Sequence, residues 1–435
     1  MSRIVHIGPG AFHRAHQAVY TQDAGDGWHI TGVSLRSAAF VDGLNAQKGR
    51  YTLVTRGSSG TNYRVITSMP SALSDAYGRR PIMEELTRAE TKIISLTITE
   101  KGYAPPFDAD SAITLLVEAL QARKEAGMTG VTLLSCDNLS ANGAVLRANV
   151  LKAVSDPALK DWIAEHVRFP STMVDRITPA TTPGLRAEVA RETGFQDQIP
   201  VETETFTQWV VEDDFAAGRP TWEKAGAQMV SDVAPYERMK LRLLNGAHSM
   251  LAYAGHVSGK RYVRDVMADA ALAQMVARHM DAAAATIDPT PGLDPKGYRD
   301  ALLARFRNPH IAHETYQIAM DGSQKMPQRI FAPALEAIRR GQDAAPFAFA
   351  TACWLRYLGG RTDAGRTHAL RDPREAELDA LPNAPEARVG ALFALPNLVP
   401  KELTAEQTFR EVTASNLRAI SENGLLAALE DLDHA

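Results

Sequence analysis

Three side chains that can take part in proton transfer lie close together in the chain: Lys240, Asn245 and His248. At about 100° per residue, an ideal α-helix places Asn245 about 140° and His248 about 80° from Lys240, on one half of its surface. A lysine in apolar surroundings can exchange a proton near neutral pH, and an amide and an imidazole can donate to an oxyanion. The other interpretation is an amphipathic helix with a solvated lysine. Glycine at 246 costs about 1 kcal/mol relative to alanine in a helix, which predicts close approach of another segment there.

A glycine-containing loop, Gly8-Pro9-Gly10-Ala11-Phe12-His13, follows an apolar run and precedes a helical pattern. Two glycines allow a tight turn and close approach of the backbone to a pyrophosphate, and a helix start offers N–H groups. The third position of the G-x-G-x-x-G fingerprint is His13 rather than glycine. We therefore predict dinucleotide binding through Gly8, Gly10, Ala11 and Phe12, with an ordinary turn as the alternative.

The segment Leu35-Arg36-Ser37-Ala38-Ala39 bears on the choice between NAD and NADP. NAD enzymes of this fold usually carry an acid at the end of the second strand, where it binds the ribose hydroxyls. The nearest acid here is Asp42. In one interpretation Arg36 faces a 2′-phosphate, which favours NADP; in the other it is an exposed residue at a strand end.

Strand-like and helical patterns alternate over the first 135 residues and predict a doubly wound α/β fold. The strand-like runs are Ile4–Ile7, His29–Leu35, Tyr51–Thr55, Tyr63–Ile66, Lys92–Thr99 and Gly130–Leu134. From Pro235 onward the patterns are helical, including Thr404–Glu430 with Thr404 as an N-cap. We expect an N-terminal Rossmann-like, dinucleotide-binding domain (residues 1–230) and a mostly helical substrate and catalytic domain (residues 231–435).

Composition narrows the class of protein. Of 435 residues, 45% are apolar and 23% charged, and the net charge of −4 gives no basic excess for nucleic acid. Two cysteines and twelve histidines show no ligand cluster, so no metal site is predicted. No apolar run is long enough to span a membrane, and the N-terminus enters its first strand at once. We expect a cytoplasmic enzyme without membrane partners, either a monomer or a small homo-oligomer.

Several blocks of the sequence resemble one enzyme family over nearly the whole chain. Lys240-x4-Asn245-x2-His248 is similar to the signature of the polyol-specific long-chain dehydrogenases, the mannitol dehydrogenase family. The opening loop through His16 and the blocks Ser95–Glu100, Ser135–Asn138 and Met173–Ile177 are also similar to family motifs. The resemblance implies a Rossmann-like domain, a helical domain and NAD as the cofactor, with NADP as the alternative.

Within the family, three segments resemble the reductases of keto-uronates more than the mannitol enzymes: Glu100-Lys101-Gly102-Tyr103, Lys240–Gly255 and Gln317–Lys325. The resemblance implies reversible, metal-independent reduction of D-fructuronate to D-mannonate. The alternatives are a mannitol 2-dehydrogenase or related polyol dehydrogenase and, in another class, a non-catalytic dinucleotide-binding protein.

The family resemblance also suggests roles for the three helix residues. Lys240 is expected to be the general acid in reduction and the general base in oxidation. Asn245 and His248 are expected to donate hydrogen bonds to the alkoxide-like oxygen. Glu237, one turn before Lys240, either holds the lysine or caps the helix start.

Further residues are expected to bind cofactor or substrate. Asn138 follows a strand end, where ligands of this fold bind, and is assigned to both cofactor and substrate. Asp175 is placed in the substrate pocket by the resemblance alone. A uronate carboxylate calls for cations, and Lys101 and Lys325 are preferred over Arg329.

Overall fold

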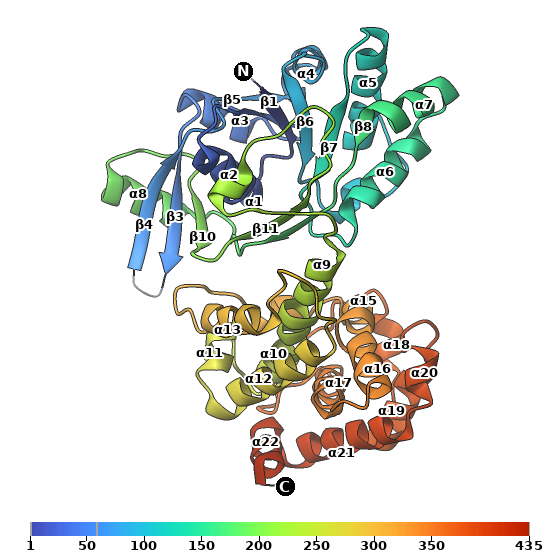
Figure 1. Ribbon diagram of the computed structural model, residues 1–435. Helices are drawn as coiled ribbons and strands as arrows, with labels where there is room; N and C mark the ends of the chain where they lie inside the picture. Colours follow the sequence, from blue (N-terminus) through green and yellow to red (C-terminus); the bar gives the residue numbers. More distant parts are fainter. Residues whose placement is uncertain (1, 58–59, 435) are drawn as a thin grey trace. The chain divides into compact units, whose positions relative to one another are not determined.

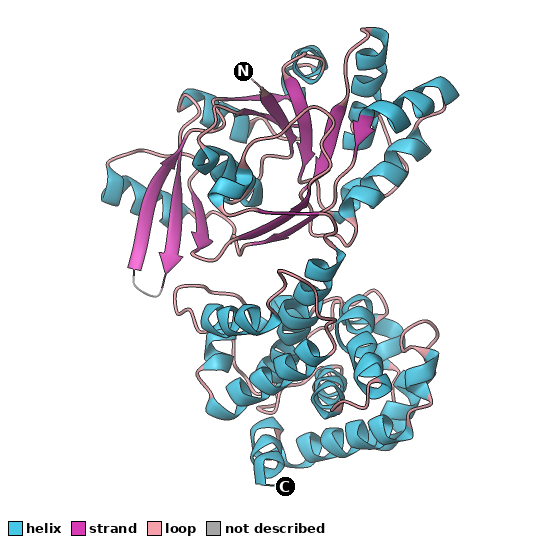
Figure 2. Cartoon of the chain, viewed as in Figure 1, coloured by secondary structure: helices cyan, strands magenta, loops and turns pink. Residues whose placement is uncertain are grey.

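The computed structural model describes residues 2–57 and 60–434, and the chain divides into two compact units. Unit 1 is Met1–Ala234 and unit 2 is Pro235–Ala435. The named strands all belong to unit 1, and unit 2 is built from helices (Figures 1 and 2). Each unit is described by itself below.

The centre of unit 1 is a six-stranded sheet in which every neighbouring pair is parallel. Its strands, in spatial order, are β5 (Ser71–Ser74), β2 (His29–Ser34), β1 (Arg3–Ile7), β6 (Thr91–Leu96), β7 (Val131–Ser135) and β8 (Val167–Arg168). The chain moves outward from β1 to β2 and β5, then crosses back to β6 on the other side of β1. The carboxyl ends of β1 and β6 therefore mark the switch point where ligands bind in such sheets.

Both faces of this sheet are covered, which explains why its strands are apolar on both sides. In β1, Ile4 packs into one core cluster, whereas Val5 and Ile7 pack into the other. The helices of unit 1 are α1 (Ala11–Ala15), α2 (Gln17–Ala24), α3 (Ala39–Ala46), α4 (Arg79–Leu86), α5 (Ala112–Glu125), α6 (Asn142–Ala153), α7 (Pro157–His166) and α8 (Pro183–Thr193), with short 3₁₀ turns η1 (Asp75–Tyr77), η2 (Glu100–Tyr103) and η3 (Trp222–Ala225). Residues of α1, α2 and α3 belong to the first cluster, and residues of α4, α5, α6 and α7 belong to the second. The predicted doubly wound α/β fold is confirmed.

Two small sheets complete unit 1. One has the order β10 (Val201–Glu204), β3 (Tyr51–Gly57), β4 (Gly60–Ile66), and the other β12 (Gln228–Val230), β11 (Gln208–Glu212), β9 (Thr172–Asp175). The runs at Tyr51–Thr55 and Tyr63–Ile66 are strands, but their assignment to the doubly wound sheet was wrong. They pair antiparallel with each other, and most of β4 is exposed or half-buried, so it has no helix layer on both faces.

Unit 2 is arranged around α10 (Gly246–Val257), in which every residue except His256 is buried. α10 packs against α12, α14 and α17, and α17 packs against α21. The helices are α9 (Ala234–Lys240), which begins at the unit boundary, then η4 (Leu241–Asn245), α10, α11 (Val263–Met267), α12 (Ala270–Ala285), α13 (Pro295–Phe306), α14 (Thr315–Ala319), α15 (Gly322–Met326), η5 (Pro327–Phe331), α16 (Ala332–Arg339), α17 (Ala345–Tyr357), α18 (Glu375–Asp379), α19 (Pro385–Ala394), α20 (Lys401–Thr404), α21 (Gln407–Asn423) and α22 (Leu425–His434).

The single helix expected over Thr404–Glu430 is instead three helices. Thr404 ends α20, and its hydroxyl donates to the carbonyl oxygen of Lys401 rather than capping α21. Gly424, at φ +82°, separates α21 from α22 in a conformation that a side chain would disfavour. Over the described residues, the search for a helix with the length and hydropathy of a membrane span found none.

Candidate active site

The glycine turn after β1 occupies the sheet's switch point. Gly8 has φ +88°, and a Cβ added to it would lie 2.3 Å from the carbonyl oxygen of Thr97, just after β6. Its N–H donates to Val33, and its carbonyl accepts a 2.7 Å bond from the Thr97 hydroxyl. Only glycine fits between the two strand ends, because a side chain would meet both a left-handed backbone and a neighbouring carbonyl. α1 after this turn is only five residues long, so a helix dipole contributes less here than the sequence led us to expect.

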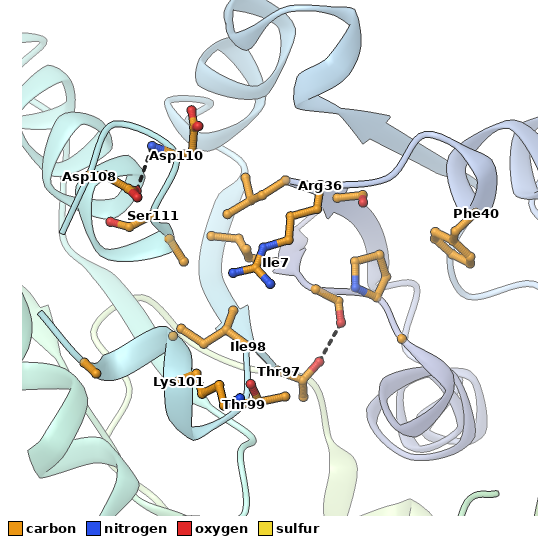
Figure 3. A pocket seen from close by; sticks show the side chains of 18 of the residues that line it. Ile7, Arg36, Phe40, Thr97, Ile98, Thr99, Lys101, Asp108, Asp110 and Ser111 are labelled. Atoms are coloured by element: carbon orange, nitrogen blue, oxygen red, sulfur yellow. Dashed lines mark hydrogen bonds between the residues drawn. The ribbon is translucent and has the colours of Figure 1, made fainter. Parts of the chain in front are cut away.

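A cavity of about 790 Å³ opens beside this turn. Gly8 and Gly10 line one side, Arg36 and Phe40 a second, and the segment from Thr97 to Lys101 a third. Figure 3 shows the Arg36 side chain extending into the cavity, with Lys101 and Asp110 nearby. The volume lies in the usual range for a cofactor pocket, and the glycine turn leaves the backbone uncovered, so the residues present fit a dinucleotide.

The cavity contains some of the predicted cofactor residues and not others. Gly8, Gly10 and Arg36 line it, as does Lys101, which the sequence assigned to the substrate. Ala11, Phe12 and Asn138 do not belong to its lining. The ring of Phe12 instead stacks on His16, with centroids 5.0 Å apart.

The acidic residues that line this cavity are Asp108 and Asp110, from the loop before α5, which were not predicted from the sequence. Asp42, the acid nearest to the second strand in the sequence, does not line the cavity. Its carboxylate accepts hydrogen bonds of 2.8 and 2.9 Å from the Tyr77 hydroxyl. A loop without periodicity carries no pattern from which this could be predicted.

Asp137, within the block Ser135–Asn138, anchors the loop after β6 and was not among the residues predicted to be functional. Its carboxylate accepts bonds of 3.0 Å from the N–H of Ile98, 2.8 Å from the N–H of Thr99 and 2.7 Å from the Tyr103 hydroxyl. Burial raises the pKa of Asp137, although these three donors act against the shift. Thr99 has φ +65°, a conformation that a non-glycine residue keeps only when its surroundings hold it. Asp137 therefore positions η2 and Lys101, and the exposed Asn138 follows it directly.

The histidines near the glycine turn form a buried stack rather than a ligand set. The rings of His6 and His13 lie 3.4 Å apart and nearly parallel. Burial lowers the pKa of His6 to about 3, so the ring is neutral at pH 7. Among the described residues, no group of three or more His, Cys, Asp or Glu side chains is placed to share a metal ion. Cys136 is also buried, and burial raises the pKa of its thiol.

In unit 2, a single continuous helical segment carries Lys240, Asn245 and His248. Its backbone changes from α-helix to the wider π-helix between Lys240 and Asn245. Lys240 is the last residue of α9, and the backbone stays helical through it at φ −59° and ψ −45°. Leu241–Asn245 (η4) is a π-helix, and Gly246 starts α10. The angles calculated for an ideal α-helix are therefore wrong here. In a π-helix the hydrogen bond joins residues five apart rather than four, so each turn holds more residues than in an α-helix. Asn245, five residues after Lys240, therefore lies closer to the side of the helix that carries Lys240.

His248 is buried and uncharged. Burial holds its pKa well below 6.5, and His313, Arg305, Arg329 and Lys240 act in the same direction. Its ring stacks on Phe306 at 4.6 Å. Within the described part of the chain, Nε2 of His248 is buried without a hydrogen-bond partner, so this nitrogen remains available to a ligand.

A second π-helix, η5, packs against η4 and brings Arg329 to it. The guanidinium of Arg329 donates long bonds of 3.4 Å to the carbonyl oxygen of Asn245 and 3.3 Å to the hydroxyl of Ser249. A Cβ at Gly246 would lie 3.1 Å from the carbonyl oxygen of Arg329 and 3.3 Å from Nε2 of His279. The predicted close approach to Gly246 is confirmed.

The other residues predicted to bind substrate, Lys325, Glu237 and Asp175, lie on three different elements. The Lys325 ammonium donates bonds of 3.2 and 2.5 Å to the carbonyl oxygens of Ile318 and Met320. These two bonds hold the chain between α14 and α15, and burial lowers the pKa of the ammonium. Glu237 is half-buried on α9, and Asp175 is buried at the end of β9 in unit 1.

Comparison with known proteins identifies the family. The model described as the mannitol dehydrogenase Rossmann domain matches residues 2–224, and the mannitol dehydrogenase C-terminal domain matches residues 232–421. The chain belongs to the mannitol dehydrogenase family.

Relatives in this family are similar over nearly their whole length. D-mannonate oxidoreductase of Escherichia coli is 38% identical, covering 97% of this chain and 94% of the relative. Mannitol 2-dehydrogenase of Aspergillus terreus is 36% identical, covering 98% and 92%. The Pseudomonas fluorescens mannitol 2-dehydrogenase, solved as a ternary complex with NAD and D-mannitol, is 34% identical with a TM-score of 0.83, covering 100% of this chain and 94% of that one.

These findings confirm the predicted family, oxidoreductase class and NAD cofactor. The alternative of a non-catalytic dinucleotide-binding protein is set aside, because relatives of nearly full length are named as oxidoreductases.

Proposed function

We propose that this chain reduces the ketone of a keto-uronate, D-fructuronate, to the secondary alcohol of D-mannonate, reversibly, with NAD(H) and to a lesser extent NADP(H). The observation that carries this proposal is the guanidinium of Arg329, whose bonds to the carbonyl oxygen of Asn245 and the hydroxyl of Ser249 are long, at 3.4 and 3.3 Å. A substrate carboxylate can form an ion pair with this cation, whereas a neutral polyol cannot. The similarity to D-mannonate oxidoreductase supports the same substrate class.

Lys240 is the proposed general acid and base. It is buried at the end of α9, where its ammonium donates a proton to the carbonyl oxygen during reduction and accepts one during oxidation. The nicotinamide supplies the hydride when bound. Asn245 and His248 donate hydrogen bonds to the same oxygen as negative charge develops on it. Because His248 is neutral, its Nε2–H acts as a hydrogen-bond donor and not as the proton source.

Arg329 is the proposed partner of the substrate carboxylate. Its guanidinium has only the two long bonds to Asn245 and Ser249, and among the described residues its Nε is buried without a partner. Lys325, preferred on sequence grounds, already uses two of its three N–H groups on backbone carbonyls. We therefore assign Lys325 to positioning and Arg329 to recognition.

The two units divide the work in this proposal. Unit 1, Met1–Ala234, binds the dinucleotide through Gly8, Gly10 and Arg36. Unit 2, Pro235–Ala435, supplies the catalytic residues. Lys101 and Asn138 are proposed to bind ligand at the strand ends of unit 1, and Asp175 to contact substrate. Glu237 is proposed to position Lys240 from one turn earlier on α9.

The second candidate is oxidation of a polyol such as mannitol. It is favoured by the relatives named mannitol 2-dehydrogenase at 36% identity and by the solved complex that contains D-mannitol. The two candidates differ in the substrate carboxylate.

Steady-state kinetics with NADH on D-fructuronate and on D-fructose separate the two candidates. We expect kcat/KM to be about a hundredfold higher for fructuronate, since a charged hydrogen-bonded pair contributes about 1.5–3 kcal/mol. Arg329→Gln should remove most of this preference by lowering the fructuronate value, whereas Arg339→Gln, an exposed change on α16, should leave both unchanged. Equal or higher activity on fructose would refute the uronate assignment.

A further inference from the structure

A second cavity, of about 430 Å³, lies in unit 2 at the carboxyl end of α10. It is lined by the last turn of α10, the loop after it, the start of α14 and the loop from Thr362 to His368. His256, in the last turn, lines it, whereas His248 lies near the other end of the same helix. The cavity is therefore separate from the catalytic residues along α10, and none of the functions proposed above uses it.

The cavity has an excess of positive charge. Its lining contains three basic residues, Lys260, Arg261 and Arg366, and one acidic residue, Glu314. Arg261 pairs with Glu314 at 2.8 Å, and Lys260 pairs with Asp269 at 3.1 Å. Arg366 is exposed and forms no ion pair with a carboxylate of the described residues, so its guanidinium can pair with an anion that enters from solvent.

Two imidazoles present unused hydrogen-bonding atoms beside this charge. Over the described chain, Nε2 of His256 and Nδ1 of His368 are buried without a hydrogen-bond partner. Burial lowers the pKa of His256 to about 4, with contributions from His368 and Arg366, so the ring is neutral at pH 7 and keeps one N–H. Buried polar atoms without partners cost free energy, which a ligand that pairs with them recovers.

Aromatic rings form one wall of the cavity. The ring of Tyr316 stacks on His256 with centroids 5.2 Å apart, and the guanidinium of Arg371 lies over the same ring, 5.5 Å from its centroid. The Tyr316 hydroxyl donates to the carbonyl oxygen of Ala369. The ring of His368 meets His256 edge-on at 4.5 Å. A volume of about 430 Å³ exceeds what an inorganic ion fills and lies in the range that holds a small organic ligand.

We propose that this cavity binds a phosphorylated sugar. Arg366 pairs with the phosphate, because a guanidinium matches phosphate oxygens in geometry and charge. His256 and His368 form hydrogen bonds with the hydroxyl groups of the sugar. The site adds a second small-molecule ligand to the oxidoreductase without taking part in hydride or proton transfer.

Isothermal titration of the NAD-saturated protein tests the proposal, since NAD occupies the coenzyme cavity. The probes are D-fructose 6-phosphate, inorganic phosphate and D-fructose. We expect saturable binding of the phosphate ester, weaker binding of inorganic phosphate in competition with it, and no binding of fructose. Arg366→Gln should weaken the ester about tenfold or more, and Arg366→Lys should weaken it less.

Two control variants make the outcome specific. Arg339→Gln removes an exposed charge elsewhere in unit 2 and should not change binding. Arg329→Gln reports on the proposed substrate site. If Arg329→Gln loses binding of the ester while Arg366→Gln retains it, the ester binds in the substrate site and this proposal is overturned. Equal binding of fructose and its phosphate, or binding of inorganic phosphate alone, would also overturn it. Thermal unfolding of each variant confirms that it is folded.

Discussion

The imidazole of His248 is neutral because it is buried and lies near several cations. Its residue type and its spacing from Lys240 are visible in the sequence, so the catalytic set could be proposed from the sequence alone. Its charge state could not, because Arg305 and Arg329 come from helices more than fifty residues away. The same limit explains why Arg329 was ranked below Lys325, whose backbone partners depend on the turn between α14 and α15.

We expect the preference between NAD and NADP to depend on residues around Arg36. Arg36 and Phe40 line the coenzyme cavity, and the exposed Ala39 lies beside Phe40 at the start of α3. We expect Ala39→Asp to raise the NAD/NADP ratio of kcat/KM, because the carboxylate repels a 2′-phosphate and binds ribose hydroxyls. Arg36→Gln should raise the ratio as well, by weakening NADP, whereas Arg80→Gln, an exposed change on α4, should not. An unchanged ratio in Ala39→Asp would mean that position 39 does not face the ribose.

The two π-helical segments, η4 and η5, pack against each other next to the proposed catalytic residues. Helical periodicity predicted helices across this region, but it could not predict the widened turns. A π turn is stabilised by tertiary contacts and leaves little trace in the spacing of apolar residues. Gly246 was the exception, since a glycine inside a helix signals a close neighbour, and Arg329 supplies it.

Adding a methyl group at Gly246 should therefore disturb the site. In Gly246→Ala the new Cβ meets the carbonyl oxygen of Arg329 at 3.1 Å, so η5 must shift. We expect destabilisation of about 1–3 kcal/mol, as in other overpacked positions, together with lower kcat. Gly390→Ala in α19 is the matched control, because its Cβ meets only the flexible end of Arg410 at 3.9 Å. Chemical denaturation should show Gly390→Ala to be neutral or stabilising. Equal effects of the two changes would contradict this account of Gly246.

Across the whole molecule, the strands of the parallel sheet were the most predictable part, because burial on both faces produces continuous apolar runs. Short strands such as β9 and β12, and the arrangement of β3 and β4 with β10, were not predictable. Some of their pairing partners are far away in the sequence; Leu53 and Val201, for example, are 148 residues apart. In the helical unit, the break at Gly424 was hidden by apolar spacing that continues on both sides of it.

Both units contain buried histidines that should make stability depend on pH. The folded-state pKa is about 3 for His6 and about 4 for His279, lowered by burial, and it is held well below 6.5 for His13 and His248. Below about pH 6.5 the unfolded chain binds protons that the folded chain does not, so the unfolding free energy falls as the pH falls. Each histidine contributes a slope of up to about 1.4 kcal/mol per pH unit.

Calorimetry between pH 7.5 and 5 should show this decline. His279→Phe keeps a ring against Phe347 and removes the titrating group, so it should flatten the pH dependence of unit 2. His310→Phe, at an exposed position, should leave that dependence unchanged. A slope that His279→Phe does not alter would show that this histidine titrates normally in the folded protein.

The central claim is that Lys240 transfers the proton while unit 1 binds the coenzyme. Single-turnover reduction of D-fructuronate by Lys240→Ala, with NADH affinity measured in parallel, tests it most directly. We predict a loss of about 10²–10⁴-fold in the rate of the chemical step, with the NADH Kd nearly unchanged. Lys401→Ala, an exposed change on α20, should retain full activity. A Lys240→Ala rate above about a tenth of wild type would contradict the assignment, because general acid catalysis contributes at least about 10²-fold.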